Sequence, residues 1–92
     1  MSTIHDMSVG EVEALSPTNF ITYLSSKKID LFLCDEHINA FANQEVAGSD
    51  FLKLTKQELI NPPYSFNTGP VNRIVEFIAQ LNNQSRFYHK TV

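Results

Sequence analysis

Cys34 and His37 carry the most reactive side chains of this sequence, and they stand three positions apart. On a helix this spacing places both on one face, where they would supply half of the ligand set of a structural zinc site. The other histidines, His5 and His89, lie near the two ends of the chain and complete no second pair. A nucleophilic cysteine would further need a lowered pKa, an orienting base and a pocket. We therefore predict no metal site and interpret His37 as a surface histidine beside a packed or capping cysteine.

Phosphate chemistry has no matching motif. Gly69 is a single glycine, and the glycine and lysine spacing of a phosphate-binding loop is absent. A chain of 92 residues builds one domain around one core, which rarely leaves room for a catalytic pocket. We predict no catalytic residue, no cofactor and no small-molecule substrate.

The charge balance disfavours nucleic acid as a partner. Seven Lys and Arg stand against ten Asp and Glu, which gives a net charge of -3, whereas proteins that bind phosphate backbones usually carry a basic excess. The single cysteine cannot form an internal disulfide, and we find neither a signal-peptide pattern nor an apolar run that would span a membrane. These features predict an intracellular protein, cytoplasmic or nuclear, without a membrane partner.

Helix signals begin after a first segment, residues 1–13, that we expect to be a loose arm or a short turn. Ser16 and Pro17 predict a helix start. The Ser16 hydroxyl can accept a hydrogen bond from a free amide of the first turn, and Pro17 lacks only an N–H group that would have no partner there. That helix carries an apolar face and is expected to end around residues 25–28. The apolar run over residues 29–33 has no second strand to pair with, so we predict a buried linker there.

Three short helices are expected next. Asp35 can cap a helix that Gly48 separates from the following segment. The apolar residues from 49 to 54 are too dense for a surface helix, so this turn is predicted to be engulfed, with three core side chains: Phe51, Leu52 and Leu54. Thr55 and Glu58 then form a capping box that starts another helix.

Consecutive prolines after Asn61 must end that helix, since they lack donors and restrict the residue before them. Gly69 and Pro70 open the last and longest helix, whose apolar stripe is Val71, Ile74, Val75, Ile78 and Leu81. Beyond it the pattern fades, and we expect a polar tail over residues 85–92. The predicted fold is all-α, with five helices in one domain over residues 14–84.

Two motifs carry a resemblance to a known family. Residues Phe41–Leu59 hold a helix-ending Phe, a small-Gly turn, a paired apolar dipeptide and Leu-Thr-x-x-x-Leu, and residues Gly69–Val75 pair a helix-opening glycine with a basic residue and an apolar pair. Together they resemble the sterile alpha motif (SAM) family. The resemblance implies a five-helix bundle with a long C-terminal helix and a role as a protein–protein interaction module.

SAM domains join an acidic mid-domain surface to the start of the last helix of another copy. The matching positions here are Glu45 and Asp50 on one side and Gly69, Asn72 and Arg73 on the other. The resemblance thus implies head-to-tail association with itself or with another SAM-like domain, and reversing the charge of Arg73 is expected to weaken it without harming the fold. The competing interpretation is that these charges are ordinary solvated residues, because isolated surface pairs contribute only about 0–1 kcal/mol.

Two other functions stay open. A branch of the SAM family binds RNA hairpins through a basic patch at the start of the last helix, but Arg73 is the one basic residue matching that patch. An enzyme would need a titratable cluster in a pocket, which the predicted bundle does not provide.

Overall fold

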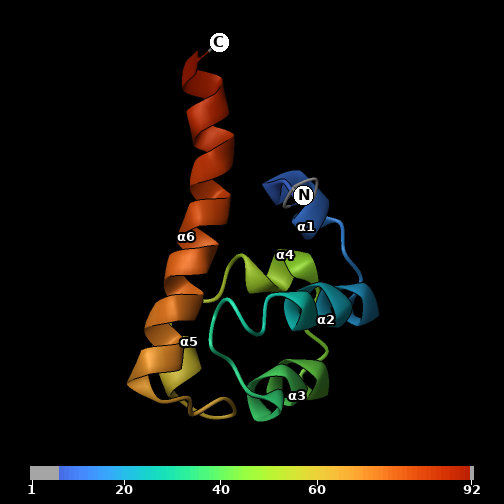
Figure 1. The fold of residues 1–92 in the computed structure, drawn as a ribbon, viewed down its shortest axis with the longest axis vertical. Coiled ribbons are helices and arrows are strands. Elements are labelled where there is room, and N and C mark those ends of the chain that lie inside the picture. The colour runs from blue at the N-terminus through green and yellow to red at the C-terminus, as the bar shows by residue number, and fades with distance from the viewer. Residues whose placement is uncertain (1–6, 92) are drawn as a thin grey trace.

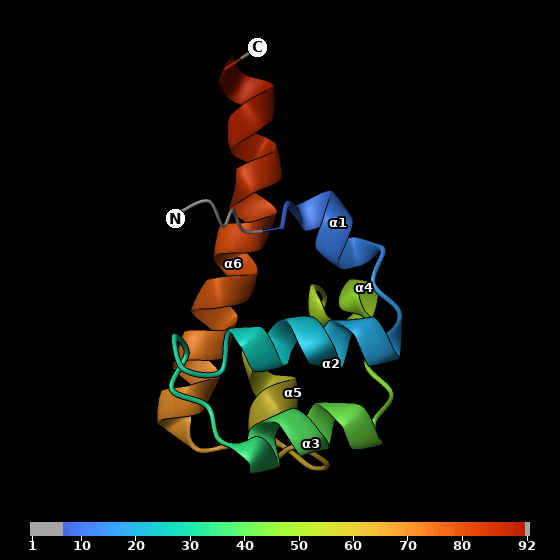
Figure 2. The ribbon, with the colours of Figure 1, turned by 45° about the vertical axis from the view of Figure 1, so that its right-hand side comes forward.

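The computed structural model describes residues 7–91, with the side chains of residues 7–83. This part of the chain forms six helices and no strand, which confirms the predicted all-α class: α1 (Val9–Glu13), α2 (Pro17–Ser26), α3 (Asp35–Asn43), α4 (Gly48–Phe51), α5 (Lys56–Ile60) and α6 (Thr68–Thr91). Helices α2 to α5 gather around the first half of α6, while its second half projects beyond them (Figure 1; Figure 2). Across residues 7–91, no helix combines the length and the apolar character needed to cross a bilayer.

The first segment was expected to be a loose arm or a short turn, and its residues 9–13 form the short helix α1. The Ser8 hydroxyl accepts from the Glu11 amide at 3.2 Å, and the Glu11 carboxylate accepts from the Ser8 amide at 2.8 Å, so the helix begins with a complete capping box. Val12 of this helix is fully buried in the core. Residues 9–13 are therefore packed structure, and the Ser-x-x-Glu pattern was the signal for it.

Two other helix starts are confirmed as predicted. Ser16 accepts from the Asn19 amide at 3.2 Å, with Pro17 as the first residue of α2. Thr55 accepts from the Glu58 amide at 3.2 Å, and the Glu58 carboxylate accepts from the Thr55 amide at 2.9 Å. The boundaries of these helices thus follow from hydrogen bonds between neighbouring residues.

The boundaries of α3 and α6 differ from prediction. Cys34, not Asp35, is the residue before the first turn of α3, and α3 ends before Glu45 and not at Gly48. Helix α6 begins one residue before Gly69 and continues to residue 91, where a polar tail was expected from residue 85. The residues at this end have adequate helix propensity but no apolar periodicity. A prediction based on periodicity therefore ends the helix too early.

Three phenylalanines from three helices form the centre of the core. Phe20 of α2, Phe41 of α3 and Phe51 of α4 are all fully buried. Their ring centroids lie 4.8 Å (Phe20–Phe51), 5.8 Å (Phe41–Phe51) and 6.3 Å (Phe20–Phe41) apart, within the range of favourable aromatic pairs. The predicted core position of Phe51 is confirmed, whereas Leu52 and Leu54 are only partly buried at the edge of this cluster.

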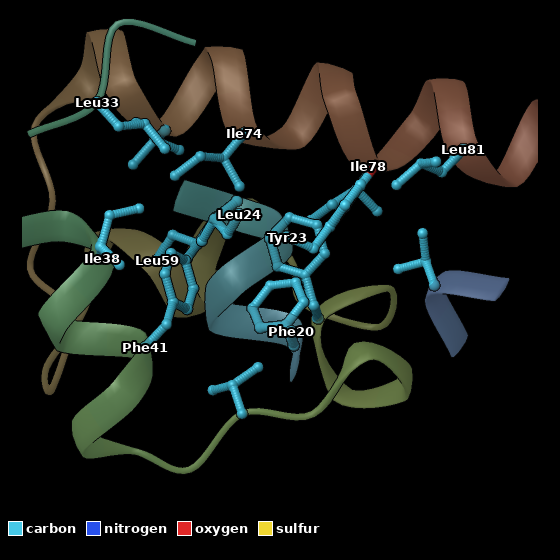
Figure 3. Packing of buried hydrophobic residues seen from close by; sticks show 14 residues of the cluster. Phe20, Tyr23, Leu24, Leu33, Ile38, Phe41, Leu59, Ile74, Ile78 and Leu81 are labelled. Carbon is cyan, nitrogen blue, oxygen red and sulfur yellow. The ribbon is translucent and has the colours of Figure 1, made fainter. Parts of the chain in front are cut away.

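Helix α6 closes the core along one side. Its buried side chains are spaced as one apolar stripe: Val71, Ile74, Ile78 and Leu81. Figure 3 shows Ile74 and Ile78 pointing from α6 toward Tyr23 and Leu24 of α2. Val75, which we predicted within the stripe, is partly buried and packs against the cluster.

Gly48 marks the closest approach of two chain segments. Its amide donates to the Leu15 carbonyl at 3.1 Å, and the Leu15 amide donates to the Val12 carbonyl at 3.0 Å. A Cβ atom at position 48 would lie 1.7 Å from the Val12 carbonyl oxygen. Glycine is required here because backbone, which cannot move aside like a flexible side chain, occupies the space that a side chain would take.

We predict that Gly48→Ala lowers the free energy of unfolding by about 1–3 kcal/mol or more, because the added methyl group forces α4 away from α1. Gly10→Ala is the matched control: a Cβ there has no neighbour closer than 3.9 Å, and alanine favours a helix by about 0.5–1 kcal/mol. Urea unfolding measures both. A Gly48→Ala protein as stable as the parent would contradict the close approach.

Candidate interaction surfaces

Glu45 is presented by the turn that ends α3. Its amide donates to the Ala42 carbonyl at 3.0 Å and the next amide, of Val46, donates to the Phe41 carbonyl at 3.2 Å, which is the pattern of a Schellman motif. Glu45 occupies the left-handed position of this motif with φ of 54°, where glycine is usual. Its side chain is exposed. The motif therefore fixes a carboxylate at the surface at some cost in backbone strain.

Asp50 lies in the first turn of α4, after the connection that joins α3 to α4. One carboxylate oxygen accepts from the Ala47 amide at 3.1 Å, so the side chain helps to start this helix. The residue is exposed. Glu45 and Asp50 thus flank the α3–α4 connection as two surface carboxylates, one of which has a structural role as well. We call this pair the acidic surface.

The start of α6 is the second surface suggested by sequence. Gly69 and Asn72 are both exposed. The first amides of a helix have no partner within it, and Pro70 has no amide, so the donors of the first turn that point outward belong to Thr68 and Gly69. We call residues 68, 69 and 72 the α6 start.

Arg73, which the family resemblance places on the partner-binding surface at the start of α6, makes contacts within the domain. Its Nε atom donates to the Leu31 carbonyl at 2.6 Å and one terminal nitrogen donates to the Phe32 carbonyl at 3.2 Å. The guanidinium also lies 5.6 Å from the centroid of the Phe32 ring. Arg73 therefore holds the connection between α2 and α3 against α6, and reversing its charge would disturb the fold as well as the surface.

The connection held by Arg73 is not the buried linker that we expected. Leu33 is buried and Leu31 is half-buried, but Ile29 is 80% exposed and Phe32 is 75% exposed. A short connection that runs beside one helix can turn only part of an apolar run inward. The dense apolar run over residues 29–33 led us to predict that the whole segment is buried. That prediction is wrong for Ile29 and Phe32, because the segment can turn only some of its side chains inward.

A groove lies at the other end of the α2 and α3 pair. It has a volume of about 370 Å³ and is lined by apolar and hydroxyl-bearing residues together with one carboxylate: Pro17, Thr18, Ile21, Thr22, Ala42 and Glu45. None of the lining residues is a cation. The groove is therefore continuous with the acidic surface through Glu45, and the sequence alone did not reveal it.

Cys34 and His37 lie together, as their spacing suggested. The Cys34 amide donates to His37 Nδ1 at 3.1 Å, and the Cys34 sulfur lies 3.4 Å from the same nitrogen. The imidazole thus completes a cap at the start of α3. Among the side chains that the structure describes, no group of three or more His, Cys, Asp or Glu is placed to hold a metal ion. His5 and the side chain of His89 lie outside the described part.

Burial lowers the pKa of His37, and the positive charge of Arg73 lowers it further, while Glu36 acts in the opposite direction. The ring packs edge-on against Phe66 at a centroid distance of 4.8 Å. A proton on Nδ1 would also remove the acceptor of the Cys34 amide. At the start of the same helix, a hydrogen bond from Lys28 and the positive charge of Lys28 lower the pKa of Asp35.

We predict that stability falls as pH drops below about 6.5, the ordinary pKa of histidine, because the unfolded chain then binds a proton that the folded chain resists at His37. His37→Gln is the matched variant, since Gln at this helix position can accept the same amide hydrogen without titrating. The variant should lose part of the decline between pH 7 and 5, as measured by urea unfolding. Identical pH profiles would contradict the folded-state role of His37, because His5 and His89 are common to both proteins.

A family comparison agrees with this architecture. A family model described as SAM-like domain matches residues 1–80, a span that includes α1 to α5 and the half of α6 that packs on them. No curated protein and no solved structure gave a match. The matched span exceeds half of the chain by a wide margin, and the chain belongs to the SAM-like domain family.

Proposed function

We propose that this chain is a protein–protein interaction module, without catalytic activity, that associates head to tail with a second copy or with another SAM-like domain. The observation that carries the proposal is the presence of two unlike exposed surfaces on one small domain: the acidic surface of Glu45 and Asp50, and the α6 start. Family membership supports an interaction role in general. The pairing of these two surfaces is our proposal.

The two surfaces are chemically complementary. The acidic surface offers carboxylates, and the α6 start offers amide donors at the positive end of a long helix dipole. A carboxylate of one copy would be received at Thr68 and Gly69 of the next, with Asn72 as a further polar contact. Because charge-assisted hydrogen bonds are stronger than neutral ones, few basic side chains are needed for such a contact.

The surfaces also lie on different sides of the molecule. Figure 1 shows the α3–α4 connection on the side of the helices that faces away from the beginning of α6. A contact between two different patches is heterologous, so it propagates into a filament or closes into a ring and does not stop at a symmetric dimer. Because the two sites lie on different sides, one copy can contact two neighbours at once.

RNA hairpin binding is the alternative function, and the charges support it less. The net charge is -3, and Arg73, which also donates to the Leu31 and Phe32 carbonyls, is the one basic residue over positions 68–75 at the start of α6. Phosphate-backbone binding requires accessible cations and weakens steeply with salt. Retention of an RNA hairpin that declines as salt rises, in a protein that does not associate, would favour this alternative.

We predict that the parent associates with rising concentration and that two sets of substitutions weaken this independently. Glu45→Gln with Asp50→Asn neutralises the acidic surface, and Asn preserves an acceptor for the α4 cap. Asn72→Glu adds an anion to the α6 start, where it should repel the acidic surface of a neighbour. Asn72→Glu changes an exposed helix position and should alter stability by under about 0.5 kcal/mol, whereas Asp50→Asn also weakens a helix cap and should cost up to about 1 kcal/mol. Size-exclusion chromatography with light scattering measures association, and thermal unfolding checks the fold.

Mixing the two variants is the sharper test. Each keeps one native surface, so the mixture should form a heterodimer that cannot extend. Variants that associate as the parent does, or a mixture that stays monomeric while the parent assembles, would contradict the proposed pairing. A parent that is monomeric at every concentration would contradict self-association and leave a different SAM-like domain as the partner.

A further inference from the structure

Two large apolar side chains stand outside the core on one connection. Ile29 is 80% exposed and Phe32 is 75% exposed, and both belong to the segment between α2 and α3. Burial of an Ile or Phe side chain stabilises a fold by about 1.5–3 kcal/mol, and these two exposed side chains contribute little of that stabilisation. Ile29 and Phe32 stand three positions apart, so this exposed apolar area is concentrated on one short segment, and concentrated apolar surface marks interaction sites. We call Ile29 and Phe32 the apolar knob.

The backbone that carries the knob is fixed in place. The Leu31, Phe32 and Leu33 amides donate to the carbonyls of residues 27, 29 and 28 at 3.0, 3.2 and 2.9 Å. Arg73 binds two carbonyls of the same segment, and the buried Leu33 side chain anchors it to the core. A segment ordered before binding loses little conformational entropy on association.

Phe32 is further held in the left-handed region, with φ of 53°. Bulky residues are rare there, and such a conformation costs on the order of 1–3 kcal/mol. Glycine or asparagine would relieve this strain and the apolar exposure together. Phenylalanine at this position therefore lowers folding stability in two ways, through the strained backbone and through the exposed ring. This double cost indicates that the ring has a function at the surface.

We propose that the apolar knob of one copy inserts into the groove between α2 and α3 of a second copy. The groove provides an apolar lining from Pro17, Ile21 and Ala42, and it is an open hollow of about 370 Å³, large enough to receive a side chain. This inference deepens the head-to-tail association proposed above and rests on it. It names the side chains that anchor that contact and the surface that receives them.

Charge complementarity assigns the occupant as another copy of this chain. The groove carries Glu45 and no cation, while the Arg73 guanidinium lies 5.6 Å from the Phe32 ring. Insertion of Phe32 would bring that guanidinium toward the groove edge where Glu45 lies. An Arg with its planar fork can bind carbonyls on one side and a carboxylate on another. Knob and groove therefore match in both apolar character and charge.

The positions of knob and groove allow the contact to repeat. In Figure 2 the α2–α3 connection lies at the end of the two helices next to α6, and the beginning of α2 lies at their opposite end. A copy seated on the groove would leave its own groove open for the next. The arrangement is heterologous, as the proposed function requires.

The test compares three single substitutions. Phe32→Asn removes the ring and suits the left-handed backbone, and Ala42→Gln fills the groove with a side chain of good helix propensity. Each should weaken association by about tenfold or more, as expected for an anchor residue and its site. Ile60→Asn is the control, because Ile60 is 44% exposed but belongs to neither knob nor groove, and it should associate as the parent does. Analytical ultracentrifugation measures the three constants.

The outcomes separate this inference from the proposed function. A mixture of the Phe32→Asn and Ala42→Gln chains should recover a heterodimer, since each retains one half of the contact. If both associate like the parent while the variants of Glu45, Asp50 and Asn72 do not, the knob is overturned and head-to-tail association survives. Loss with Ala42→Gln alone would overturn the assignment of the groove to Phe32. If Phe32→Asn unfolds, Ile29→Asn supplies the same test.

Discussion

Helices of four to ten residues are unstable in water by themselves, so α2, α3 and α4 persist because Phe20, Phe41 and Phe51 meet in one buried cluster. Each ring comes from a different helix, and the cluster therefore fixes the mutual positions of all three. The contact of Gly48 with the Val12 and Leu15 backbone brings α4 close enough to contribute its ring. Helix α6 covers the remaining side with its apolar stripe.

The same packing determines what remains outside. Once Leu33 is drawn into the core and Arg73 binds the carbonyls before it, Ile29 and Phe32 have no interior left to occupy. At the far end of α2 and α3, the Schellman motif places Glu45 beside a groove. An apolar projection and an apolar recess thus arise at the two ends of one helix pair. A domain this small has little interior to spare for a pocket, so both features lie on its surface.

Local chemistry predicted local structure well. Caps at Ser16 and Thr55 and the prolines after Asn61 placed helix boundaries, because hydrogen bonds between close neighbours decide them. The same reasoning would have found α1 from Ser8 and Glu11. The hydrogen bonds of Arg73 to the segment that carries Phe32 join residues some 40 positions apart in sequence, and the groove joins residues 17–22 to residues 42 and 45; no periodicity encodes such contacts. The candidate surfaces at Glu45 and Asp50 came from family resemblance and stay a prediction.

If unlike ends of two copies meet, a probe at one end must lie near the other end of a second copy, and the single cysteine provides a place for such a probe. Cys34 is exposed and adjoins the α2–α3 connection. A nitroxide attached there on one chain, mixed with an isotope-labelled Cys34→Ser chain, reports which residues of the second copy lie nearby by broadening their NMR signals. We expect broadening at Thr18, Thr22 and Ala42 around the groove. Broadening confined to the second chain's own residues 27–34 would show a symmetric contact and contradict it.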